Sequence, residues 1–358
     1  MTADLQDVGT SPAAPAVGEA PLSPSDGGRR ARREAASKRS RSVPRVPKLW
    51  VRDQGKAARP RGRRRKPSPI WQYVISVLTG VALLCLGFVF LLAIGSPFQA
   101  SRDQQVLYSD FRKSLAEGTA PVSALTFEGL PLEIGAPVAI LGLPTFGKEF
   151  VVVYGTASPQ TMTGPGLRRD TVFPGQAGVS IIQGRQSAFG GPFGSIGQLT
   201  PGTEITVTTG QGFSVYSVTG VRRANDPQPP PLAAGAGRLT LISAEGTPYL
   251  AESTVRVDAA LVSTSADGTT IDKAAFPAGV RSATTLTLPD AERPMQGDTA
   301  NAFALVLWAQ LFLVAVIFVT WARERWGRWQ AWTVGAPLLL ATGWAVANQV
   351  TAFLPNLL

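Results

Sequence analysis

Long stretches without a charged side chain lie on both sides of a mixed central region. Residues 67–100, 299–321 and 329–358 contain no Asp, Glu, Lys or Arg. An α-helix needs about 20 apolar residues to cross the hydrocarbon layer of a membrane. We therefore expect transmembrane helices over residues 70–95, 300–321 and 331–353. The first run is too long, and too far from residue 1, for an ordinary cleavable signal, so it predicts an uncleaved anchor.

Basic side chains next to these runs predict the orientation of the chain. Lys and Arg concentrate in the cytoplasmic segments that border transmembrane helices. The cluster before the first run and the loop over 323–328 would both be cytoplasmic, which places residues 97–298 and the C-terminus outside the cell. Basic residues at the inner membrane surface bind anionic lipid headgroups. Those expected there are Arg61, Arg63, Arg64, Arg65, Lys66, Arg323, Arg325 and Arg328.

Small residues within the apolar runs predict close helix packing. Glycine allows two helix backbones to approach each other in a membrane, and the runs contain Gly80, Gly87, Gly335 and Gly343. One anchor would suffice to tether a domain, so three spans indicate a partner protein within the membrane.

The central region changes from a helical to a strand-like pattern. Leu107, Phe111 and Leu115 recur at helical spacing, so residues 97–130 should form an amphipathic helix and linker. From 134 to 262, short runs rich in Val, Ile and Thr alternate with Gly and Pro, as in a β-barrel.

Two hairpins are expected in and after this region. Residues 204–221 predict a hairpin that turns at Gly210-Gln211-Gly212. A second hairpin, with its turn at Asp267-Gly268, and a linker should fill residues 263–298. The predicted fold is mainly β, a closed barrel of about eight strands with three transmembrane α-helices.

The net charge of +10 comes from one end of the chain. Residues 1–68 contain 17 of the 34 basic residues but only 6 of the 24 acidic ones. This segment has no apolar periodicity and almost no aromatic residues, so we expect a disordered basic cytoplasmic tail. The remaining residues are close to neutral, which argues against nucleic acid as a partner of the folded part.

The absence of two residue types limits the possible chemistry. The chain has no histidine, and its one cysteine, Cys85, lies within the first apolar run. No internal disulfide, His/Cys zinc site, Ser-His pair or Cys-His pair can form. We expect no metal and no cofactor.

Several short segments between residues 134 and 262 follow one another in a characteristic order. They are Gly164-Pro165-Gly166, Pro174–Gly178, Gly184, Gly190–Phe193, Leu199–Val207, Tyr216–Val221 and Leu239-Thr240-Leu241. Their order resembles the sortase family of Gram-positive cell-surface enzymes, which implies a sortase-type barrel with a cleft for an extended peptide. A sortase forms a thioacyl intermediate, which requires a thiolate.

The resemblance also locates the catalytic positions, and each departs from the family pattern. Arg185 stands where the family has histidine, and Ala244 where it has the nucleophilic cysteine. The position of the family arginine falls on Ser253, although Arg256 is only three residues further along. We therefore expect no cysteine transpeptidase activity.

The leading interpretation is a protein that binds or scaffolds envelope peptides or proteins at the outer face of a Gram-positive membrane. Arg185 would then bind an anionic or carboxylate-bearing partner, or else form a structural salt bridge, for example with Glu245. Two alternatives stay open: an enzyme with an unrecognised nucleophile such as Ser243, and a membrane regulator that acts through its basic tail. The candidate groove residues are Gln183, Arg185, Ser243 and Glu245.

Overall fold

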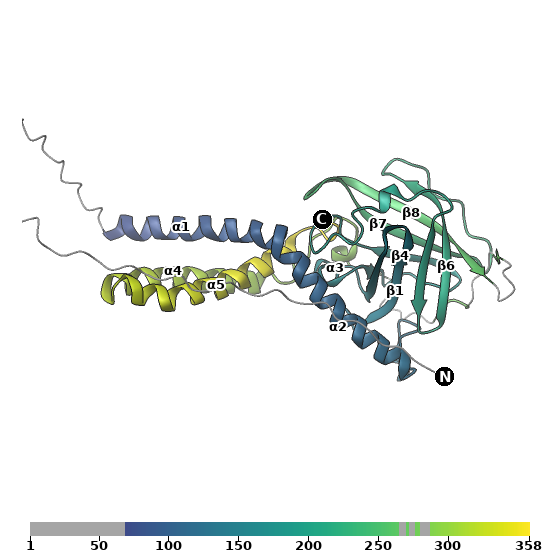
Figure 1. Ribbon diagram of the computed structural model, residues 1–358, viewed down its shortest axis with the longest axis horizontal. Coiled ribbons are helices and arrows are strands. Elements are labelled where there is room, and N and C mark those ends of the chain that lie inside the picture. The colour runs from purple at the N-terminus through teal and green to yellow at the C-terminus, as the bar shows by residue number, and fades with distance from the viewer. Residues whose placement is uncertain (1–68, 265–269, 272–275, 280–286) are drawn as a thin grey trace, which may run out of the picture. The chain divides into compact units, whose positions relative to one another are not determined.

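The computed structural model describes residues 69–264, 270–271, 276–279 and 287–358 (Figure 1). Contacts group Lys66–Leu358 into one compact unit. The predicted basic tail over 1–68, with Arg61, Arg63, Arg64, Arg65 and Lys66, lies outside the described residues. The predicted turn at Asp267-Gly268 also lies outside them, although the short strand β9 (Thr270–Ile271) pairs antiparallel with the strand that precedes this turn.

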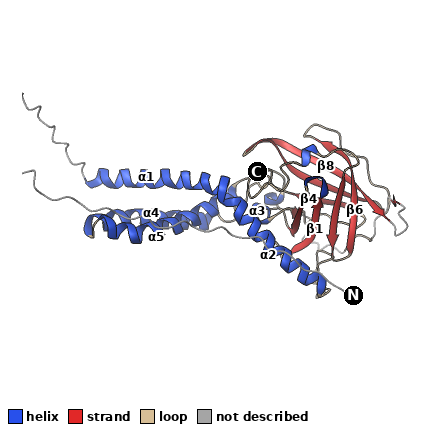
Figure 2. Ribbon diagram, viewed as in Figure 1, coloured by secondary structure: helices blue, strands red, loops and turns tan. Residues whose placement is uncertain are grey.

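The first helical region is longer than its apolar run. Helix α1 (Pro69–Phe90) continues through a π-helical turn (Leu91–Gly95) into α2 (Ser96–Ala116), as Figure 2 shows in blue. Pro97 lies in the first turn of α2, where a missing N–H costs little. The predicted amphipathic helix is confirmed: Phe111 is fully buried, and Leu107 and Leu115 pack beside it.

Two further helices follow the barrel. They are α4 (Ala302–Arg325) and α5 (Arg328–Phe353), and both pack against α1. A Cβ atom on Gly80 would lie 3.1 Å from Val316, and one on Gly335 would lie 2.7 Å from Val319. These two glycines therefore serve close packing within the chain itself. Gly87 has open space around it.

Of the three predicted transmembrane helices, two are supported by length and apolar composition. Two helices of the described chain are long and apolar enough to cross a membrane, one over Ile70–Ala116 and the other over Ala302–Arg325. Helix α5 occupies the third predicted span, but its polar positions, among them Gln330, Asn348 and Gln349, lower its hydropathy. Arg323, Arg325 and Arg328 are all exposed where α4 ends and α5 begins.

Eight strands close into a barrel. Their order around it is β6-β5-β1-β2-β3-β4-β7-β8, and pairing between β6 and β8 closes the ring. The pairs β2–β3 and β4–β7 are parallel. The closed barrel predicted from the sequence is confirmed, but the long helices make the whole chain mixed α and β rather than mainly β. The strands are β1 (Pro137–Leu143), β2 (Lys148–Tyr154), β3 (Gly166–Leu167), β4 (Gly178–Gln183), β5 (Glu204–Thr209), β6 (Gly212–Arg222), β7 (Gly237–Thr247) and β8 (Leu250–Thr264).

Alternation along the strands fills the barrel. In β5, Ile205 and Val207 are fully buried, while Thr206 between them is partly exposed. The predicted hairpin is confirmed, because Thr209 pairs with Gly212 across Gly210-Gln211. Gly212 has a φ of +131°, which a residue with a side chain rarely adopts.

Candidate functional site

The register of β7 and β8 determines which side chains share a face. Ala244 pairs with Thr254, Ile242 with Arg256, and Glu245 with Ser253. Residues paired across antiparallel strands point to the same face. Arg256 therefore shares the face of Ala244, whereas Ser253 lies on the opposite face. This geometry argues against Ser253 as the position of the family arginine and favours Arg256.

Ala244 lies on the outer face of the barrel. Leu239 and Leu241, at the alternate positions of β7, belong to the barrel core. Ile242 and Ala244 belong instead to a separate buried cluster with Leu357. We call the outer surface of β4, β7 and β8 around Gln183, Ile242 and Ala244 the groove face.

Ser243 points into the barrel. It lies on the same face of β7 as Leu239 and Leu241, because side chains alternate between the two faces of a strand, and its side chain is fully buried. Its Oγ has no hydrogen-bond partner among the described residues. A serine in this position cannot reach a peptide that lies on the groove face.

Arg185 is fully buried just beyond the end of β4. Its Nη2 donates hydrogen bonds to Ser158 Oγ at 2.7 Å and to the Ser158 carbonyl at 3.1 Å. Its Nη1 donates to the main-chain oxygen of Leu358 at 3.4 Å, and its guanidinium carbon lies 5.1 Å from the centre of the Phe189 ring. Burial lowers the pKa of Arg185 to about 9. Among the described residues, no Asp or Glu side chain forms an ion pair with it.

Glu245 has a different partner from the one proposed. Its Oε1 accepts a hydrogen bond from Arg223 Nε at 2.6 Å, and its Oε2 accepts one from Ser253 at 3.0 Å. The hydrogen bond from Arg223 is the main reason that the pKa of Glu245 lies below its usual value. The expected salt bridge between Arg185 and Glu245 is therefore wrong.

The chain itself covers the groove face. We call residues Leu354–Leu358, which follow α5, the post-α5 segment. Leu357 is fully buried in the cluster with Ile242 and Ala244. In Figure 1 the chain end marked C lies at the side of the barrel, near β7. Gln183 and Arg185 are consequently both inaccessible to solvent.

A second segment borders the post-α5 segment. Its short 3₁₀ turn (Asp290–Glu292) presents the Glu292 carbonyl to Thr156 Oγ1 at 2.9 Å and to Gln183 Nε2 at 3.3 Å. The buried Glu292 carboxylate forms an ion pair with Arg169. Sequence analysis did not identify Ser158, Glu292, Asn356 or Leu357 as residues of this site, and no local motif marks them.

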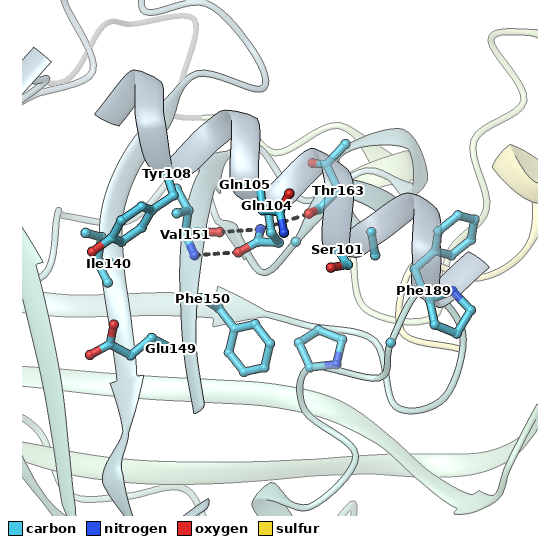
Figure 3. A pocket seen from close by; sticks show the side chains of 15 residues that line it. Ser101, Gln104, Gln105, Tyr108, Ile140, Glu149, Phe150, Val151, Thr163 and Phe189 are labelled. Atoms are coloured by element: carbon cyan, nitrogen blue, oxygen red, sulfur yellow. Dashed lines mark hydrogen bonds between the residues drawn. The ribbon is translucent and has the colours of Figure 1, made fainter. Parts of the chain in front are cut away.

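A separate cavity of about 490 Å³ lies between α2, the strands β1 and β2, and the loop at Phe189 (Figure 3). Gln104 spans it: its Oε1 accepts from Val151 N at 2.7 Å, and its Nε2 donates to Val151 O at 3.1 Å and Thr163 O at 2.8 Å. The amide of Gln104 thereby replaces a neighbouring strand along the edge of β2. This cavity lies apart from Ala244 and contains none of the predicted groove residues.

Comparison with known proteins gives one family. Residues 141–257, about a third of the chain, match the family model of the sortase domain. No protein with a curated description matches the chain in sequence.

The following three solved structures are similar to part of the chain, and each is a sortase. The sortase D5 transpeptidase of Clostridium perfringens is 17% identical, with a TM-score of 0.38 over 45% of this chain and 99% of that one. The SrtF sortase of Corynebacterium diphtheriae is 22% identical, with a TM-score of 0.34 over 37% and 88%. Sortase E1 of Streptomyces coelicolor, solved with a tripeptide in its active site, is 22% identical, with a TM-score of 0.32 over 36% and 90%.

Proposed function

We propose that this chain, whose residues 141–257 match the sortase domain, is a membrane-anchored sortase-fold protein that binds extended peptide or protein segments without transpeptidation. The observation that carries this proposal is the composition of the groove face. The resemblance puts Ala244 at the family's cysteine position, and the face around Ala244 is already covered by a short turn of the chain that buries Leu357.

The chemistry of acyl transfer supports a role without turnover. Thioester formation needs a thiolate, and alanine offers no nucleophile. Cys85 lies in the middle of α1, within an apolar run. Ser243 faces the barrel interior, and with no histidine in the chain it also lacks the usual base. The alternative of an enzyme with a serine nucleophile is therefore disfavoured.

The membrane has a defined place in this proposal. Helices α1 and α4 act as anchors, and α5 packs against both and returns from the cytoplasmic side to the barrel, which lies at the outer face of a Gram-positive cell envelope. Tyr73 Oη and Glu324 Oε2 lie 3.4 Å apart, which places the start of α1 beside the end of α4. The exposed Arg323, Arg325 and Arg328 at that end would contact anionic lipid headgroups on the cytoplasmic side.

The chemistry of Arg185 indicates which ligand the groove would prefer. A buried cation loses its hydration, and no Asp or Glu side chain of the described residues forms an ion pair with Arg185. An anionic group placed near Nη1, in the position of the Leu358 main-chain oxygen, would compensate this charge. The proposed ligand is therefore an extended segment that carries a carboxylate.

A direct test measures peptide binding to the purified full chain in detergent micelles. Fluorescein-labelled heptapeptides with Asp at one position are compared with the same peptides carrying Asn, by fluorescence anisotropy. We expect the Asp peptides to bind at least tenfold more tightly, and Arg185→Gln to remove this difference.

Two variants complete the test. Ala244→Trp should block binding by filling the groove face, whereas Leu250→Trp, at an exposed position on β8, should leave it unchanged. Leu357→Asp should expose the groove by expelling the post-α5 segment. If neither the intact chain nor Leu357→Asp binds any peptide, the proposal is wrong, and the regulatory role of residues 1–68 becomes the better explanation.

A further inference from the structure

We propose that the post-α5 segment is a tethered ligand of the groove face, which closes the site until an incoming chain with similar side chains displaces it. This inference rests on the proposed function, because it assumes that the groove binds polypeptide. It adds the identity of the resident occupant and the features that a competitor must present.

The first of these features is an apolar side chain in the position of Leu357. Leu357 is fully buried between Ile242 and Ala244, with Ala251 and Met295 packed beside it. Its carbonyl accepts a hydrogen bond from Gln186 N at 2.8 Å. The post-α5 segment is thus held at Leu357 both by a main-chain hydrogen bond and by an apolar side-chain pocket.

The second feature is a side chain that donates hydrogen bonds one residue earlier. Asn356 Nδ2 donates to Thr156 O at 2.7 Å and Arg293 O at 3.0 Å, and it lies 3.4 Å from Gln183 Oε1. All of these partners are acceptors. The position therefore selects an amide and rejects a carboxylate, which would place negative charge against three oxygen atoms.

The occupant leaves some of the site's polar groups without partners. Among the described residues, Arg185 Nε and Asn356 Oδ1 are buried and make no hydrogen bond. A buried polar atom without a partner weakens the bound state relative to one in which every group is paired. A chain that also pairs Arg185 Nε has an advantage over the post-α5 segment.

The tether determines how strong a competitor must be. Asn356 follows the last residue of α5, Phe353, by three positions, and the end of α5 is itself held because Ser158 Oγ donates to Thr351 O at 3.3 Å. A ligand on such a short tether acts at an effective concentration of about 1 mM. A free peptide with the same intrinsic affinity as the post-α5 segment would need to reach that concentration to compete. A partner anchored in the same membrane also has a raised local concentration and can compete more easily.

Cysteine crosslinking of the full chain tests whether the segment occupies the groove. Cys85→Ala removes the only cysteine. In this background, Ala244→Cys combined with Leu357→Cys should crosslink rapidly on oxidation or with a short bis-maleimide. The control pair, Ala244→Cys with Leu340→Cys, uses an exposed position on α5 and should not crosslink. A yield no higher than that of the control would overturn the inference and leave the proposed function standing, because no external ligand takes part.

Displacement tests whether the segment acts as a ligand. The probe is a fluorescein-labelled amide of residues Thr351–Leu358, added to the full chain in micelles. We expect Leu357→Asp to bind this probe at least tenfold more tightly than the intact chain, and Leu357→Met to bind it as the intact chain does. Efficient crosslinking with no gain in probe binding by Leu357→Asp would mean that the segment is a permanent part of the fold, which would contradict the inference.

Discussion

Replacing Arg185 by methionine probes whether a buried, unpaired charge costs the protein stability. Methionine fills much of the same space but carries no charge. Burial lowers the pKa of Arg185 from its usual value to about 9, which corresponds to about 5 kcal/mol against the charged form. The guanidinium regains free energy through its bonds to Ser158 and Leu358, at about 1.5–3 kcal/mol for each bond to a charged group. The two contributions nearly cancel, so Arg185→Met should change the free energy of unfolding by less than about 2 kcal/mol.

A second arginine provides a matched control. Arg222 forms an ion pair with the buried Asp258, which also accepts a hydrogen bond from Thr240. Arg222→Met leaves this carboxylate buried without its cation, which typically costs about 3–5 kcal/mol. The two variants should therefore differ clearly, although both remove an arginine from the barrel.

Hydrogen–deuterium exchange of the β7 amides in the full chain measures both costs. The seven tryptophans of the described residues lie in or directly beside the long helices, so their fluorescence would mainly report on the helices. We expect faster exchange in β7 for Arg222→Met than for Arg185→Met. If Arg185→Met is the more destabilised of the two, Arg185 has a structural role that its hydrogen bonds do not explain.

Two further predictions concern helix packing and pH. Gly335→Ala should weaken the contact between α4 and α5, because the new Cβ would lie 2.7 Å from Val319. Gly87→Ala should leave the free energy of unfolding unchanged or raise it by up to about 1 kcal/mol. Thermal unfolding followed by circular dichroism compares the two variants, and equal effects would contradict this packing. Burial raises the pKa of Tyr154 and Tyr216 to about 12, above the value of 10 in the unfolded chain. Their contribution to the free energy of unfolding is therefore complete below pH 10 and is lost as the pH rises to 12. Ultraviolet titration should show both tyrosines still protonated at about pH 11, and ionisation of either near pH 10 would refute this prediction.

The barrel could be predicted because its strands follow simple patterns. Ile205 and Val207 alternate with polar residues, and the Gly210-Gln211 turn joins two such runs. The spacing of apolar residues is a local property of the sequence, and it matches the folded protein wherever one face of a helix or strand is buried. The helix around Phe111 was predictable for the same reason.

The closure of the groove could not be predicted, because it depends on contacts between distant parts of the chain. Leu357 contacts Ala244 from more than one hundred positions away. In the sequence, the uncharged stretch that contains Leu357 is indistinguishable from the end of a membrane helix. The register that puts Arg256, rather than Ser253, on the face of Ala244 also depends on strand pairing, which spacing alone did not determine.

Peptide turnover by the full chain is the most direct test of the central claim. Quenched fluorescent peptides and an amine acceptor are incubated with the intact protein and with Leu357→Asp, and products are identified by mass spectrometry. Because the resemblance puts Ala244 at the position of the family's nucleophile, we predict no cleavage or transfer above the rate without protein for either form. Catalytic product formation that disappears with Ser243→Ala would contradict the account and show that the barrel carries a serine enzyme.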